Sequence, residues 1–179
     1  MTLVLLLGGA RSGKSRVALA LAAEEPGPVV FLATARAVDE EMAARIERHR
    51  RERPAGWATV EEPLELRGAI ESADPAACLV IDCLTLWVAN LLERLGPDEA
   101  EAAAIAAAAS ARARPGTTIA VSNEVGLGLV PMHPLGRRYR DLLGSVNRIW
   151  ADASARVALV VAGRVLPLER PGILLDEAG

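Results

Sequence analysis

The chain has 179 residues, of which 51% are hydrophobic, 24% charged and 3% aromatic, and its formal net charge is −3. This length predicts one domain, residues 1–179, with enough apolar residues to form a core without disulfides or metal. The apolar fraction excludes a disordered chain, the slightly acidic balance argues against nucleic-acid binding, and the longest apolar runs are too short for stable membrane insertion.

The pattern of apolar residues predicts strands alternating with helices. Five continuous runs rich in Val, Ile and Leu are typical of parallel strands covered on both faces: Leu3–Leu7, Val29–Ala33, Cys78–Asp82, Thr118–Ser122 and Val157–Ala162. Helical patterns occupy Lys14–Ala23, Val38–Arg53, Leu64–Ser72, Leu84–Leu95, Asp98–Arg112 and Gly136–Ala155. We therefore expect a three-layer α/β fold with a mostly parallel central sheet. The segment from Pro167 on is expected to be an edge strand or a loosely held tail.

A glycine-rich segment lies directly between the first strand and the first helix. Its sequence fits G-x-x-x-x-G-K-[ST] at every defined position: Gly8, Gly9, Ala10, Arg11, Ser12, Gly13, Lys14 and Ser15. Such a loop turns backbone N–H groups toward an anion, and the helix adds its positive end. We expect Lys14 to contact the β- and γ-phosphates of a nucleotide and Ser15 to bind Mg²⁺. The alternative is a glycine-rich turn that binds nothing.

The second helix carries one of only two histidines. Val38, Met42 and Ile46 predict a buried stripe, and the spacing places His49 on the same face. Neighbouring arginines disfavour the imidazolium form, and a neutral imidazole can attack phosphorus. His49 is therefore a candidate nucleophile for nucleotidyl transfer. Alternatively, it is a half-buried histidine on a solvated basic helix.

Other segments supply candidate ligands or packing residues. Asp82 follows a buried strand and would serve Mg²⁺ or the nucleotide, or else cap the next helix. The Ala-rich helix from residue 100 to 113 is interpreted as a packing helix. The shaped loop from Ser122 to Leu135 would bind a ligand through Asn123 and Glu124, or simply connect to the next helix. Three tryptophans and two cysteines are expected to be buried in the core or at an interface: Trp57, Trp87, Trp150, Cys78 and Cys83.

Four motifs in this order carry a resemblance to a known family. They are the glycine-rich loop, His49-Arg50-x-x-Arg53-Pro54, Trp57-x-Thr59-x-Glu61 and Ser122-Asn123-Glu124-Val125-Gly126. From about Leu3 to about Gly163 the sequence closely resembles the bifunctional adenosylcobinamide kinase / adenosylcobinamide-phosphate guanylyltransferases of cobalamin synthesis. That family implies a RecA-like P-loop fold and a homotrimer with sites near subunit boundaries.

The resemblance also implies two reactions. ATP or GTP phosphorylates adenosylcobinamide; then GTP guanylylates a histidine, here His49, and the GMP passes to adenosylcobinamide phosphate to give adenosylcobinamide-GDP. Family nucleotide contacts map onto residues from Gly8 to Ser15 and onto Ala33, Thr34, Ala35, Arg50, Arg51, Glu52, Arg53, Glu61 and Asp82. Lys14 and His49 would be the catalytic residues, and Ser15 and Asp82 would hold Mg²⁺.

Two other functions compete with this interpretation. A simple P-loop small-molecule kinase would use the arginine-rich helix only as a lid and would form no GMP adduct. A nucleotide-dependent switch would act on a protein partner, although no partner-binding segment is evident. Without an evident signal peptide or disulfide framework, a cytoplasmic location is expected.

Overall fold

The computed structural model describes residues 2–170 and 172. Within this part of the chain, seven strands form one sheet: β1 (Leu3–Leu7), β2 (Val29–Ala33), β3 (Ala58–Glu61), β4 (Cys78–Asp82), β5 (Thr118–Val121), β6 (Arg156–Val161) and β7 (Arg164–Pro167). The helices are α1 (Lys14–Ala23), α2 (Glu40–Arg51), α3 (Leu66–Ser72), α4 (Leu84–Leu92), α5 (Pro97–Ala113) and α6 (Pro134–Ala153). None of these helices has the length and apolarity needed to cross a bilayer.

The strand order in the sheet is β3-β2-β4-β5-β1-β6-β7. Every neighbouring pair is parallel except the antiparallel pair of β6 and β7. The carboxyl ends of β1 to β6 therefore meet at one edge of the sheet, which is where open α/β sheets bind ligands.

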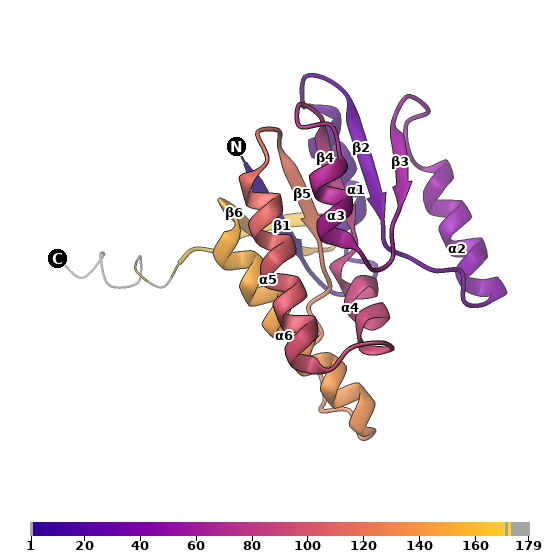
Figure 1. The fold of residues 1–179 in the computed structure, drawn as a ribbon, viewed down its shortest axis with the longest axis vertical. Helices are drawn as coiled ribbons and strands as arrows, with labels where there is room; N and C mark the ends of the chain where they lie inside the picture. The colour runs from indigo at the N-terminus through magenta and orange to yellow at the C-terminus, as the bar shows by residue number, and fades with distance from the viewer. Residues whose placement is uncertain (1, 171, 173–179) are drawn as a thin grey trace.

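Helices cover both faces of the sheet and enclose two separate cores (Figure 1). Within β4, Leu79 and Ile81 point into the core under α3 to α6, whereas Cys78 and Val80 point into the core under α1. This alternation explains why the strand is apolar throughout, because neither of its faces meets water. The predicted three-layer α/β fold is confirmed.

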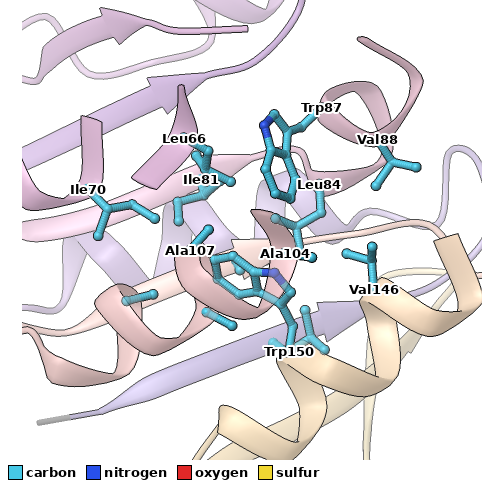
Figure 2. Packing of buried hydrophobic residues seen from close by; sticks show 14 of the residues in the cluster. Leu66, Ile70, Ile81, Leu84, Trp87, Val88, Ala104, Ala107, Val146 and Trp150 are labelled. Carbon is cyan, nitrogen blue, oxygen red and sulfur yellow. The ribbon is translucent and has the colours of Figure 1, made fainter. Parts of the chain in front are cut away.

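The Ala-rich helix α5 is a packing helix, as its sequence predicts. Its buried face consists of alanines, which lets α5 and α6 approach closely. Figure 2 shows Trp150 of α6 beside Ala104 and Ala107, with Trp87 of α4 nearby. Both indoles are almost completely buried, and Trp87 Nε1 donates to the Leu64 carbonyl at 2.8 Å.

Most predicted elements are present, with ends shifted by a few residues, but two strands were not expected as such. All four residues of β3 are exposed, and its sequence contains no continuous apolar run that would predict a strand. The segment is extended because it pairs with β2. Strand β7 ends at Pro167, whereas the sequence predicted that an edge strand or tail begins there. Most of that predicted tail lies outside the described residues.

The predicted buried stripe of the second helix is wrong. Helix α2 contributes no buried residue, and the side chain of Val38, just before it, is 64% exposed. Met42, Ile46 and His49 are partly exposed. The reason is its position: α2 lies beyond the edge strand β3 (Figure 1). Near its end, Arg50 and Arg53 reach back to the sheet.

Candidate active site

The glycine-rich loop leaves β1 and enters α1 in the conformation that its sequence requires. Gly8 has φ +154° and Gly13 has φ +96°, and both values belong to the region that glycine tolerates best. A Cβ at Gly8 would lie 2.3 Å from the Val160 carbonyl oxygen, so the strand itself leaves no room for a side chain. Arg11 also has a positive φ of 56°. The loop therefore has the backbone conformation that its glycine spacing predicts.

Lys14 folds back over this loop. Its Nζ donates to the Gly9 carbonyl oxygen at 2.7 Å and contacts Ser12 Oγ at 3.4 Å. Burial lowers the pKa of Lys14, the charge of Asp82 opposes this effect, and the charge of Arg45 adds to it. A bound phosphate would restore favourable electrostatics around this ammonium group.

Two neighbouring segments hold the loop by main-chain hydrogen bonds. The Glu124 N–H, just after β5, donates to the Gly8 carbonyl oxygen at 3.1 Å. The Gly163 N–H, in the turn between β6 and β7, donates to the Ser12 carbonyl oxygen at 2.8 Å. The loop therefore has fixed partners at both ends before any ligand binds.

Ser15 and Asp82 fit a magnesium site of the P-loop kind. Ser15 lies in the first turn of α1, and Asp82 ends β4, two strands from β1. Among the described residues, neither side chain makes a hydrogen bond, and no cluster of three or more His, Cys, Asp or Glu forms a complete metal site. A hydroxyl and a carboxylate suit Mg²⁺, which keeps waters and phosphate oxygens as its other ligands. Asp82 does not cap α4; the N-cap residue is Cys83.

Thr34 connects the ends of β2 and β4. The side chain is fully buried, and its Oγ1 donates to the Cys83 carbonyl oxygen at 2.7 Å and accepts from the Cys83 N–H at 2.9 Å. Asn90 Nδ2 donates to the Thr34 carbonyl oxygen at 2.9 Å. Ala33 is buried and Ala35 partly exposed on either side. The Thr34 hydroxyl is therefore committed to positioning the backbone next to Asp82.

A second group of charged residues lies two strands beyond Asp82, at the end of α2. Arg50 forms an ion pair with Glu61 at the end of β3. Arg53 stacks on Phe31, with 3.7 Å between the guanidinium carbon and the ring centroid, and its Nη1 donates to Thr59 Oγ1 at 3.3 Å. Burial lowers the pKa of Arg53, and the charge of Asp82 partly opposes this effect. Arg50, Arg53 and Glu61 therefore form one cluster at the carboxyl edge.

His49 lies in the last turn of α2, next to this cluster and partly exposed. Its side chain makes no hydrogen bond with any described residue. Arg51 instead binds Glu47 of the same helix at 3.1 Å, and Glu52 is the C-cap residue. His49 therefore precedes Arg50 on α2 without a polar contact to the cluster among the described residues, and Arg51 is linked to the cluster through Glu47, which also pairs with Arg50 at 3.7 Å.

The glycine-rich loop and the cluster of Arg50, Arg53 and Glu61 occupy different parts of the same edge. Strand β3 is four positions from β1, and at about 4.8 Å per step the two strand ends are about 19 Å apart. Charged residues affect both parts of the edge: the charge of Arg45 lowers the pKa of Lys14, and the charge of Asp82 raises the pKa of Arg53.

Two supporting residues were not identified from the sequence. Gly163 was seen only as the end of the matching region, although it binds the glycine-rich loop. Asn147 is buried in α6; its side chain receives a hydrogen bond from Ser122 Oγ at 2.6 Å and donates to the Asn123 carbonyl oxygen at 3.0 Å. Asn147 shares a helix face with Leu143, Val146 and Trp150, and this spacing could have indicated from the sequence that it is buried.

Comparison with known proteins agrees with this geometry. A family model described as cobinamide kinase / cobinamide phosphate guanyltransferase (CobU) matches residues 4–168. The chain belongs to this family. A Pseudomonas aeruginosa relative, "Bifunctional adenosylcobalamin biosynthesis protein CobP", is 48% identical over 92% of this chain and 96% of its own. An Escherichia coli relative, "Bifunctional adenosylcobalamin biosynthesis protein CobU", is 41% identical over 90% of this chain and 96% of its own.

Solved structures support the fold of this CobU-family chain. One solved ATPase domain matches with a TM-score of 0.52 at 15% identity, over 99% of this chain and 72% of that one. An ATPase of a type III secretion system of pathogenic bacteria matches with a TM-score of 0.55 at 12% identity, over 98% and 53%. At such low identity the likeness concerns the P-loop ATPase fold alone.

Proposed function

We propose that this chain phosphorylates adenosylcobinamide with ATP or GTP and then transfers GMP from GTP to adenosylcobinamide phosphate through His49. The observation that supports this proposal is that one sheet edge holds the glycine-rich loop with Lys14 and, beyond the strand four positions away, the helix that carries His49 and Arg50. A phosphoryl-transfer site and a second site with a nucleophile are what two successive reactions require.

The first reaction takes place at the glycine-rich loop. The substrate hydroxyl oxygen attacks the γ-phosphorus, the bond from that phosphorus to the bridging oxygen breaks, and the nucleoside diphosphate leaves; the hydroxyl proton passes to solvent. Lys14 and the N–H groups from Gly9 to Ser15 would stabilise the charge on the transferred phosphoryl group. Mg²⁺, held by Ser15 and Asp82, would neutralise the β- and γ-phosphate oxygens.

The second reaction needs His49. A neutral imidazole nitrogen attacks the α-phosphorus of GTP, pyrophosphate leaves, and the ring proton is lost to solvent. A terminal oxygen of adenosylcobinamide phosphate then attacks the same phosphorus, the P–N bond breaks, and the ring takes up a proton from solvent, which regenerates neutral His49. Arg50 and Arg53 would bind the phosphates, because a guanidinium offers two parallel donors to a phosphate group. The ion pair of Arg50 with Glu61 would set the direction of this fork.

We further propose that the chain acts as a homotrimer in the cytoplasm. Membership of the CobU family is what supports this assembly. The cysteines Cys78 and Cys83 are both free thiols, as is usual in a reducing compartment.

The decisive experiment is incubation with α-labelled GTP and Mg²⁺. The parent protein is expected to carry a label that acid removes and base does not, as a phosphoramidate does, and His49→Ala is expected to carry none. His133→Ala is the matched control, because His133 is the other histidine and is exposed at the start of α6. Lys14→Ala is expected to lose phosphorylation of adenosylcobinamide, whereas His49→Ala retains it.

Each outcome discriminates between functions. If His49→Ala is labelled as well as the parent, His49 is not the nucleophile. A parent protein that phosphorylates adenosylcobinamide but never acquires label is a simple kinase. If His49→Ala folds normally but loses the kinase reaction too, the two sites are not separate.

A further inference from the structure

An uncharged, strongly exposed loop follows β5. We define the apolar loop as residues 125–135, which include no Lys, Arg, Asp or Glu. Val125 packs against the core, whereas five later side chains are exposed: Leu127 is 86% exposed, Leu129 96%, Val130 61%, Met132 94% and Leu135 59%. Contiguous exposed apolar surface of this kind marks a binding site rather than a random surface.

The apolar loop is held in shape by hydrogen bonds to its backbone. At its start, the Gly126 N–H donates to Glu124 Oε1 at 2.5 Å. Near its end, Arg137 Nη1 donates to the carbonyl oxygens of Met132 at 2.6 Å and Pro131 at 3.1 Å. These bonds engage the backbone and leave the apolar side chains pointing outward, so their exposure is a property of the fold.

The position of the apolar loop connects it to phosphoryl transfer. Strand β5 lies between β1 and β4, so the loop leaves the sheet between the glycine-rich loop and Asp82. Directly before it, the Glu124 N–H binds the Gly8 carbonyl oxygen. In Figure 1 the chain then continues past the sheet edge to the start of α6, which projects beyond the rest of the molecule. The apolar loop therefore begins directly beside the glycine-rich loop, at the edge of the sheet that carries Asp82.

The substrate of the proposed kinase reaction has surface that suits the apolar loop. A cobinamide is a broad macrocycle with methyl groups on its faces and amide arms around its rim, and only its terminal hydroxyl enters the reaction. The hydroxyl must approach the γ-phosphate while the macrocycle stays outside the loop. Aliphatic side chains bind the faces of such a ring through buried apolar area, and charged side chains would lose hydration there.

We infer that the apolar loop is the docking surface for the corrin macrocycle, with Leu129 and Met132 as its main contacts. This inference rests on the proposed kinase function. The macrocycle lies on the outward side chains of the loop, and its aminopropanol arm reaches between Glu124 and the glycine-rich loop toward the γ-phosphate.

The test is the double variant Leu129→Ser/Met132→Gln in the full chain. Both side chains are almost fully exposed, so the melting temperature is expected to remain that of the parent. The KM for adenosylcobinamide is expected to rise about tenfold or more, since two apolar contacts are lost. The KM for ATP and the labelling of His49 by GTP, which needs no corrinoid, are expected to stay unchanged. The matched control is Ile105→Ser/Leu166→Gln, which removes two apolar side chains that are 55% and 58% exposed elsewhere.

The outcomes separate this inference from the proposed function. If the parent protein does not phosphorylate adenosylcobinamide, the proposed function itself fails. If the parent is active and the loop variant keeps the parent KM for adenosylcobinamide, the docking surface is wrong. If the loop variant changes the mass of the assembly in solution, the apolar loop is a contact between copies of the chain, which also overturns the inference.

Discussion

Two adjacent glycines in the phosphate-binding loop should respond very differently to the same substitution. At Gly8 an alanine Cβ would lie 2.3 Å from the Val160 carbonyl oxygen and 2.8 Å from Ser12 Oγ, where ordinary contact is about 3.5 Å. Val160 O belongs to strand β6 and cannot rotate away. At Gly9 the same Cβ would meet nothing within 4 Å.

The expected loss in the free energy of unfolding of Gly8→Ala is the sum of two costs. A non-glycine residue at φ +154° is strained by about 1–3 kcal/mol, and overpacking against a fixed backbone adds a further 1–3 kcal/mol or so. A total of about 4 kcal/mol lowers the melting temperature of a chain of this size by roughly 10 °C. Gly9→Ala should change the free energy of unfolding by no more than about 0.5 kcal/mol.

The assay is urea unfolding of both variants without nucleotide, so that ligand binding does not add to the measured stability. A Gly8→Ala protein as stable as Gly9→Ala would refute the loop geometry described here. Equal destabilisation of both variants would refute it too, because this geometry predicts a cost at Gly8 that Gly9 does not have.

Three further predictions concern stability. Thr34→Val should lower the free energy of unfolding by about 2 kcal/mol in urea titrations, because it leaves the Cys83 backbone groups unpaired, whereas the exposed Thr59→Val should change it little. Arg114→Ala should cost about 3 kcal/mol or more, since this buried guanidinium donates to four carbonyl oxygens around the end of α3, and Arg114→Lys should restore only part of the loss. Burial raises the pKa of Cys78 from 9.0 to about 11. The folded state therefore holds this proton more tightly, and stability is lost as the pH rises from 9 toward 11. Between pH 8 and pH 10 the parent should lose about 1 kcal/mol more than Cys78→Ala, and an equal loss in both would contradict the assignment.

The sequence was most informative where the pattern is local. The glycine-rich loop, its flanking strand and its helix could be placed to the residue, because glycine spacing and a continuous apolar run depend only on neighbours in sequence. Strand β3 could not be predicted, since its four exposed residues are extended only through pairing with β2. The buried stripe predicted for α2 was wrong for the same reason, because the sequence indicates which helix face is apolar but not whether another element covers that face.

Roles that join distant segments were also out of reach. The sequence did not predict that the Thr34 hydroxyl binds the backbone of Cys83, 49 residues away. Gly163 closes on the phosphate-binding loop through a contact over an even longer stretch of chain. Such contacts depend on strand order, which apolar periodicity does not encode.

The location of α2 outside the sheet has a consequence for mutational tolerance. Most of what makes the molecule fold lies between α1 and the α3–α6 layer, so changes along the histidine-bearing helix leave both cores intact. Substitutions along this helix are therefore tolerated by the fold, whereas a side chain at Gly8, which is packed against β6, is not.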